Sequence, residues 1–364
     1  MKQNVYNLNI VLIGLVLSLI SSHVFAVNAG EVVGRHIFGL ARDYQGDPMI
    51  IDSGPLIYKK SSSNESITIN DNHFSVSIFD HDVGSIYISE LSEDRKQYID
   101  TYLLDISAVN GVSKATGAIK TSWNSVLFSE NIMPDANASD QFVENYKAYF
   151  KNNKDLVNPY NYGWINELVI LNKDGQAKVI KNYAMGRLSA SKVIAMPDEK
   201  TFYILDSENS GNIYLFISSK KGSLSKGTLY ALVNINGDFT YLNLGKSPAL
   251  KMKFKLRKAD FTTFFDQQPV QGNRCVSPYA LIETVYGEEC LRIRPKAKKY
   301  AGQFEPARVT ALLGGKPAIS NIIDIGFDAI KSHLILISRD KSSQAIALER
   351  NEIMKSNYIA KVTQ

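Results

Sequence analysis

The sequence is poor in cysteine, with two in 364 residues. This number excludes a scaffold held together by many disulfides and a zinc site built from thiolates alone. An excess of one charge is also missing, because 41 basic side chains are offset by 36 acidic ones. The formal net charge of +5 gives no electrostatic footprint for nucleic acid, which is therefore not expected among the partners.

Hydrophobic runs long enough to cross a membrane are missing as well. The N-terminal apolar run, residues 10–20, has 11 residues, whereas a membrane-spanning helix needs roughly 20. Lys2 precedes this run, and small side chains at Val24 and Ala26 fit the recognition positions of a signal peptidase. We therefore expect a signal peptide over residues 1–26, with cleavage after Ala29 as the second choice. The mature chain would be periplasmic or secreted, without a stable membrane span.

Export changes the interpretation of Cys275 and Cys290. These residues enclose a segment of 14 residues, and in an oxidising compartment we expect them to form one disulfide. A cross-link that closes a loop this short would stabilise the fold by about 3 kcal/mol. Paired thiols would be unable to act as nucleophiles or metal ligands.

The rest of the chain is dominated by short segments rich in β-branched and aromatic residues. The predicted strands span residues 85–91, 99–106, 165–171, 201–205, 212–218, 227–234 and 333–338. Polar turns such as residues 172–175 (NKDG) and 236–238 (NGD) leave little room for crossover helices, which favours antiparallel sheet. Helix is expected at residues 138–150, where aromatic residues recur every four positions, and around residues 296–304. The pattern predicts an all-β fold with one or two short helical insertions, either a propeller or a pair of sandwiches.

No self-contained catalytic motif is found in the sequence, such as a nucleophile elbow, a zinc-protease histidine pair or a phosphate-binding loop. The five histidines are scattered. Asp80, His81 and Asp82 form either a cation site or a solvated turn. The lysine doublets at residues 220–221 and 298–299 are too short to make a basic patch for an acidic partner.

One stretch of the chain contains a series of distinctive blocks. They are residues 121–125 (TSWNS) leading to Ser129 and Glu130, Tyr162 and Gly163 followed by Glu167, residues 185–189 (MGRLS), Asp206 and residues 226–230 (KGTLY). These blocks resemble the PhoX-type alkaline phosphatases, a family of exported β-propeller phosphomonoesterases that use calcium with iron. The resemblance extends from about Trp123 to Ser338, which is close to two thirds of the mature chain.

The resemblance implies one β-propeller-like domain of about five to six blades over residues 27–364. It also implies calcium as the cofactor and a phosphomonoester as the substrate of an active chain. By position, Glu130, Glu167 and Asp206 would be the metal ligands, because calcium prefers carboxylate oxygens. Arg187 would be the catalytic residue that contacts the phosphate.

Several metal ligands of the family are missing from this chain. Ser129 stands where some members have a cysteine that binds iron, and a neutral hydroxyl is a poor iron ligand, so iron binding is not expected. Other family carboxylates or histidines are replaced by Asn131, Ala190, Ser191, Ser207 and Ile323, the last with Asp324 as a neighbouring substitute. The chain also ends at Gln364, before the later blades of the family. It therefore resembles a shortened member whose ring need not close and whose phosphomonoester hydrolysis is reduced or lost.

Each retained residue also has a purely structural interpretation. Glu130 and Glu167 could be strand-end carboxylates in solvent or paired with a lysine, and Asp206 could satisfy backbone N–H groups in a turn. Arg187 could form an ion pair at the end of a strand. The alternative function from a different class is a non-catalytic periplasmic propeller that binds a protein partner or a ligand on one face.

Overall fold

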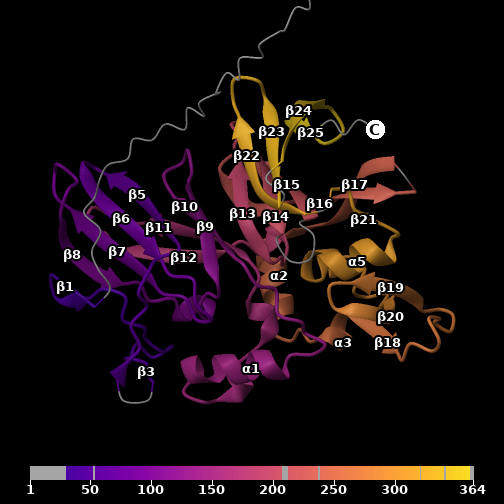
Figure 1. Ribbon diagram of the computed structural model, residues 1–364, viewed down its shortest axis with the longest axis horizontal. Coiled ribbons are helices and arrows are strands. Elements are labelled where there is room, and N and C mark those ends of the chain that lie inside the picture. Colours follow the sequence, from indigo (N-terminus) through magenta and orange to yellow (C-terminus); the bar gives the residue numbers. More distant parts are fainter. Residues whose placement is uncertain are drawn as a thin grey trace, which may run out of the picture.

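The computed structural model describes residues 30–51, 54–206, 212–236, 238–319, 321–339 and 342–360. The predicted signal peptide lies outside these residues. The described chain consists mainly of antiparallel sheets with short helices between them, as Figure 1 shows. The predicted all-β, propeller-like fold is confirmed. No helix in the described part of the chain is long and apolar enough to cross a membrane.

Four sheets of the described chain contain four or more strands that pair in chain order. The first contains β5 (Ser63–Ile69), β6 (Asn72–Ile78), β7 (Ile86–Leu91) and β8 (Tyr98–Leu103). The second contains β9 (Ala115–Lys120), β10 (Val126–Glu130), β11 (Ile165–Ile170) and β12 (Ala177–Lys181). The third contains β13 (Ala190–Ala195), β14 (Thr201–Asp206), β15 (Asn212–Lys220), β16 (Ser223–Ile235) and β17 (Asp238–Pro248), and the fourth β22 (Ile322–Asp328), β23 (His333–Ser338), β24 (Ser343–Asn351) and β25 (Ser356–Ala360). We call these sheets the first to fourth blades.

The first strands of the four blades lie next to one another in chain order. Strand β5 contacts β9, β9 contacts β13, and β13 contacts β22. In β9, Gly117 has a φ of +63°, and a Cβ atom there would lie 2.3 Å from the carbonyl oxygen of Ser191 in β13. Glycine therefore allows two of these strands to approach more closely than any side chain would permit.

After β17 the chain leaves the blades and forms an inserted unit over residues 249–317, called the insertion below. It contains α2 (Ala249–Leu256), α3 (Phe261–Phe264), α4 (Ala301–Phe304) and α5 (Pro306–Leu312), together with a sheet of β18 (Phe265–Gln268), β20 (Gly287–Ile293) and β19 (Ala280–Thr284). The unit ends at β21 (Lys316–Pro317), which returns to pair with β16. In Figure 1 the insertion, in orange, lies on the opposite side of the molecule from the first blade, in indigo and purple.

Hydrophobic clusters fill the spaces between neighbouring blades. Phe74 and Phe128 belong to the cluster between the first and second blades. Tyr203 and Leu336 belong to the cluster between the third and fourth blades. A further cluster, which contains Trp164, joins the second and third blades to the insertion. Burying one large apolar side chain contributes about 1.5–3 kcal/mol, so these layers fix the positions of the blades and of the insertion.

The predicted strands are all present, with boundaries shifted by a few residues at most. The helix expected at residues 138–150 is α1 (Asp140–Tyr146), continued by a 3-10 helix (Lys147–Phe150). The segment expected around residues 296–304 ends in α4, whereas α2, α3 and α5 were not predicted. The remaining elements are the 3-10 helices Ser107–Val109, Lys154–Leu156, Pro159–Asn161 and Tyr183–Met185, and the short strands β1 (Val32–Val33), β2 (His36–Ile37), β3 (Ile50–Ile51) and β4 (Gly54–Pro55).

Cys275 and Cys290 are joined by a disulfide in the structure. The bond ties the segment before β19 to β20, and thus closes a loop within the sheet of the insertion. Cys290 is completely enclosed, with 1% of its surface exposed. The disulfide therefore supports the hairpin of β19 and β20, which forms one side of the pocket described next.

Candidate functional site

A pocket of about 660 Å³ lies where the third blade meets the insertion. Asp206 at the end of β14 and Asn212 at the start of β15 line one side of it. Residues 281–286, which include most of β19, line another side. Strand β19 lies at an edge of its sheet and pairs with β20 on one side. The pocket runs along this edge strand. We call this cavity the Asp206 pocket.

Helix α5 and the turn after it complete the wall of the Asp206 pocket. Ala307, Thr310 and Ala311 line the pocket, and their spacing places them on one face of α5. Their side chains are small, and Gly314 in the turn after the helix has none, which leaves the space open. The hydroxyl oxygen of Thr310 is enclosed and has no hydrogen-bond partner among the described residues.

Three charged side chains line the Asp206 pocket, namely Asp206, Glu283 and Lys316. Asp206 is 8% exposed, whereas Glu283 and Lys316 are exposed. Burial raises the pKa of the Tyr214 phenol, which also lines the pocket, and the charge of Asp206 raises this pKa further. A charge that is shielded from water acts more strongly than an exposed one, which is consistent with the effect of Asp206 on the buried Tyr214.

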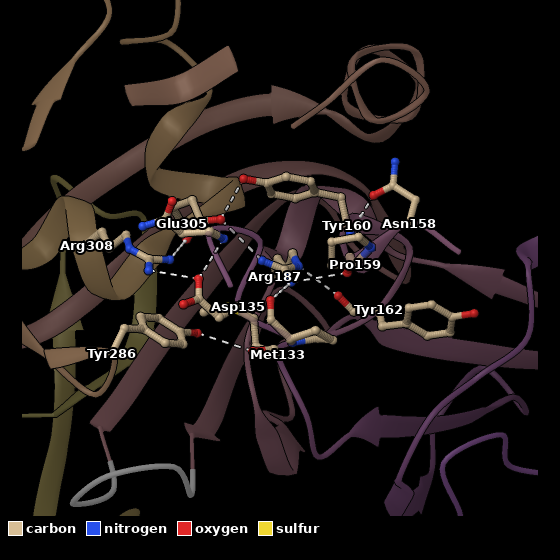
Figure 2. A network of polar contacts seen from close by, with 12 residues as sticks. Met133, Asp135, Asn158, Pro159, Tyr160, Tyr162, Arg187, Tyr286, Glu305 and Arg308 are labelled. Carbon is tan, nitrogen blue, oxygen red and sulfur yellow. Dashed lines mark hydrogen bonds and ion pairs between the residues drawn. The ribbon is translucent and has the colours of Figure 1, made fainter. Parts of the chain in front are cut away.

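A network of charged side chains, drawn in Figure 2, contacts the pocket wall through Tyr286. The Arg308 guanidinium is completely buried and pairs with Glu305 at 2.9 Å, Glu289 at 2.7 Å and Asp135 at 2.9 Å. Its carbon lies 4.0 Å from the ring centroid of Tyr286, a residue of the pocket wall. The network therefore fixes the wall that the insertion contributes.

Arg187, the predicted catalytic residue, lies in the same network and is completely buried. Its Nε donates to the carbonyl of Tyr162 at 2.9 Å, and its Nη2 donates to the carbonyls of Pro134 and Pro159. Its Nη1 lies 3.4 Å from Glu305. Arg187 does not line the Asp206 pocket. The structure thus places Arg187 in an ion pair within the core, and its contact with a phosphate stays a prediction without support from these contacts.

Glu130, a predicted metal ligand, forms a fully buried ion pair with Lys181, with 3.2 Å between Oε1 and Nζ. The backbone N–H groups of Ser113 and Trp164 donate to its two oxygens, each at 2.9 Å. Burial raises the pKa of Glu130 and lowers that of Lys181, while the opposite charge of each partner acts in the other direction. The lysine and the two N–H groups together satisfy this carboxylate.

Glu167 and the Asp80–Asp82 turn are also engaged within the protein. The Oε1 atom of Glu167 accepts hydrogen bonds from the indole of Trp123 and the hydroxyl of Ser125, both at 2.7 Å. Asp82 pairs with Lys114 at 3.0 Å, and the ring of His81 stacks on Tyr58. These contacts link loops of neighbouring strands.

The arrangement of the predicted ligands does not fit a calcium ion. No group of three or more histidine, cysteine, aspartate or glutamate side chains in the described ranges is placed to hold a metal. Calcium needs several oxygen ligands at once, and the Lys181 ammonium beside Glu130 would repel a cation. Calcium binding therefore stays a prediction for measurement, as does the expected lack of iron binding.

Sequence reasoning missed Lys181 and Glu305, which balance the charges of Glu130 and Arg187. It also missed Arg308 and Glu289, which extend the network from Glu305. A signal for two of them is present, because Glu305 and Arg308 are the charged residues of the mostly apolar segment 301–313 and are three positions apart. Side chains at this spacing are close enough to form an ion pair.

Comparisons with known proteins give distant structural links. No protein-family model and no curated protein matches the chain. The solved structure of Pseudomonas fluorescens PhoX in complex with vanadate, a transition state analogue, matches with a TM-score of 0.39 and 13% identity, covering 92% of this chain and 81% of that one. Putative 6-phosphogluconolactonases from Bacteroides uniformis (TM-score 0.22, 12% identity, 79% and 80% covered) and Bacteroides fragilis (TM-score 0.26, 11% identity, 87% and 91% covered) also match. At these values the likeness is remote and assigns no activity to the chain.

Proposed function

We propose that the protein is an exported, propeller-like binding protein that holds a small ligand in the Asp206 pocket and in which phosphomonoester hydrolysis is reduced or lost. The pocket itself carries the proposal. Its volume of about 660 Å³ lies within the range of small-molecule sites, which combine apolar walls with a few polar groups. The charged side chains of Asp206, Glu283 and Lys316 supply such groups.

The loss of hydrolysis is supported by the partners of Glu130 and Arg187. Metal-assisted phosphoryl transfer requires cations and donors that point at the phosphate. The Glu130 carboxylate instead has Lys181 and two backbone N–H groups as partners. The Arg187 guanidinium is occupied by Glu305 and three carbonyl groups. Releasing Glu130 would leave the buried Lys181 without its counter-charge, and releasing Arg187 would leave three carbonyl groups without this donor; both changes are costly.

We expect calcium to have no measurable effect on the purified mature chain. Its melting temperature should be the same in chelator and in millimolar calcium, because an ion that binds the folded state raises the melting temperature. Elemental mass spectrometry should find far less than one calcium or iron per chain, and p-nitrophenyl phosphate should be hydrolysed no faster than by the Glu167→Gln variant. Stoichiometric calcium with activity lost in Glu167→Gln would restore the alternative, a calcium-dependent phosphomonoesterase.

Filling the pocket tests the binding function separately. A leucine at position 311, on the pocket face of α5, should occupy space that a ligand needs. In a thermal-shift screen of small polar and amphiphilic molecules, those that stabilise the wild type should have a weaker effect on Ala311→Leu. The control is Ala108→Leu, the same substitution at an exposed position in the first half of the chain. Ligands that stabilise both variants equally would place their site elsewhere and contradict the proposal.

A further inference from the structure

We infer that helix α2 and the turns before α4 form a docking surface for an anionic phospholipid membrane, on which the protein lies without spanning it. Lysine and arginine side chains would contact the lipid phosphates. Two exposed apolar side chains of α2 would enter the interface between headgroups and acyl chains. The inference goes beyond the proposed binding function and does not involve the Asp206 pocket.

Basic side chains are concentrated in two segments, residues 246–258 and 296–299, which we call the basic surface. Together these segments contain nine of the 41 basic side chains and no acidic one. The nine are Lys246, Lys251, Lys253, Lys255, Arg257, Lys258, Lys296, Lys298 and Lys299. The rest of the chain therefore has fewer basic than acidic side chains, an asymmetry that the formal net charge of +5 conceals.

The fold brings the two basic segments together. The Lys255 ammonium in α2 lies 5.2 Å from the ring centroid of Tyr300, which directly follows the second segment. A Cβ atom on Gly245, directly before the first segment, would lie 3.5 Å from the carbonyl oxygen of Lys299. The lysine doublet at residues 298–299, too short by itself for a basic patch, therefore belongs to a larger one.

The charges of the basic surface are available to a partner. Eight of the nine side chains are exposed, and Lys255 is half-buried. None of them forms an ion pair with another described residue, unlike the neighbouring Arg294, which pairs with Asp266 at 2.7 Å. Cations that are gathered without counter-charges repel one another. An anionic surface would supply the missing counter-charge.

Helix α2 also presents two apolar side chains to solvent. Met252 and Leu256 are buried, whereas Leu250 and Phe254 are 65% and 58% exposed. Leu250 and Phe254 are four positions apart, so they lie one above the other on the outer face of the helix. We call these two side chains the apolar ridge.

Basic side chains flank the apolar ridge on both sides. The helical repeat places Lys253 and Arg257 along one side of it and Lys251 along the other. Leucine and phenylalanine between basic residues are typical of helices that lie in a membrane interface. An acidic polypeptide could neutralise the same charges, but it would need a complementary groove for the ridge, whereas a bilayer interface accepts apolar side chains of any shape. The observations therefore favour a membrane.

Vesicle co-sedimentation of the mature chain, which lacks the N-terminal apolar run, tests the inference. We expect the protein to bind vesicles of equal parts phosphatidylglycerol and phosphatidylcholine and to stay in solution with phosphatidylcholine alone. Each basic residue close to an anionic surface should strengthen binding by about fivefold. Added salt should weaken the binding, because it screens these charges.

A first double variant tests the charges. Lys251→Gln with Lys253→Gln should weaken binding to the anionic vesicles by about ten- to thirtyfold. The control is Lys59→Gln with Lys60→Gln, which removes two exposed lysines before β5. It causes the same change of net charge outside the basic surface and should leave the binding unchanged.

A second double variant tests the apolar ridge and keeps every charge. Leu250→Gln with Phe254→Gln should weaken binding by about tenfold, because these side chains would no longer enter the interface. The control is Ile330→Gln with Ile353→Gln, at two turn positions of the fourth blade that are 97% and 93% exposed. It should leave the binding unchanged. Thermal unfolding followed by circular dichroism should be the same for all four double variants, since each alters exposed positions.

Several results would overturn the inference. They are absent binding to anionic vesicles, equal binding to both kinds of vesicle, and an equal loss in a double variant and its control. Soluble poly-glutamate provides the test for an acidic polypeptide. If it bound as tightly as the anionic vesicles, and if the ridge variant bound the vesicles as well as the wild type, the partner would be an acidic polypeptide and not a membrane.

Discussion

Replacing Glu305 with leucine is expected to lower the free energy of unfolding by about 3–5 kcal/mol. Glu305 is completely buried and accepts hydrogen bonds from Tyr160 at 2.8 Å, Arg308 at 2.9 Å and Arg187 at 3.4 Å. Arg308 would keep Glu289 and Asp135 as partners. Arg187 would have carbonyl groups as its remaining partners, so its charge would stay buried without a counter-charge. Urea unfolding followed by circular dichroism measures the difference.

The double variant Arg187→Met with Glu305→Leu isolates this mechanism. Removing both members of the pair abolishes the uncompensated charge, so the double variant should lose less stability than the sum of the two single variants. Glu93→Gln on the surface should change the stability by less than about 0.5 kcal/mol. Strictly additive losses would show that Arg187 and Glu305 do not interact in the folded protein. If Glu305→Leu does not fold, Glu305→Gln can replace it in the cycle.

Replacing Lys181 with methionine is the second change with a large expected effect, about 3–5 kcal/mol at pH 7. The substitution leaves the Glu130 carboxylate buried without its cation, 0% exposed. Lys181 lowers the pKa of Glu130, and burial raises it, so the variant should have a pKa raised further above the ordinary value of 4.5. A raised pKa in the folded state contributes stability below the unfolded-state pKa and loses it as the pH rises through the folded-state pKa. The defect should therefore be large at pH 7 and smaller near pH 4.

The matched reference for this experiment is the double variant Glu130→Gln with Lys181→Met, which has no ionisable group at either position. The difference in unfolding free energy between Lys181→Met and this double variant should increase from pH 4 to pH 7. Subtracting the double variant removes the pH dependence of all other groups. A difference that does not change with pH would mean that Glu130 has the same pKa in the folded and the unfolded chain, contrary to the expected shift.

The strands were predictable because local chemistry determines them. In the β11–β12 hairpin, the side chain of Asn172 accepts hydrogen bonds from the N–H groups of Asp174 and Gln176. Gly175 adopts a φ of +78°, which glycine tolerates best. These residues determine the turn whatever the rest of the fold does. The β-branched residues on both sides then pair in the only register that the turn allows.

Helix α2 shows where local pattern fails. Leu250, Met252, Phe254 and Leu256 occupy every second position, which is typical of a strand. In the structure the segment is helical, with Met252 and Leu256 buried and Leu250 and Phe254 exposed. Met252 and Leu256 are four positions apart and pack into the cluster that joins the insertion to the blades. Tertiary packing here outweighs the alternation.

The candidate site was predictable in part. Asp206 was selected from the sequence and lies in the pocket, but the pocket exists because the insertion folds back against the third blade. The contacts of Glu130 and Arg187 could not be predicted, because their partners Lys181 and Glu305 are 51 and 118 residues away. Several acidic and basic residues could serve as partners over such separations, and the sequence does not indicate which ones meet.

The separation between Arg187 and Glu305 also sets an order of events during synthesis. The carbonyl groups that bind Arg187, from Pro134, Pro159 and Tyr162, are made before it, whereas Glu305 follows 118 residues later. At a translation rate of about 5–20 residues per second, this interval lasts roughly 6–24 s. Throughout this time Arg187, which is buried in the folded protein, lacks the carboxylate of Glu305 as its partner. The seam between the second blade and the insertion can therefore close only after the second and third blades have been made, and shortly before the fourth blade follows.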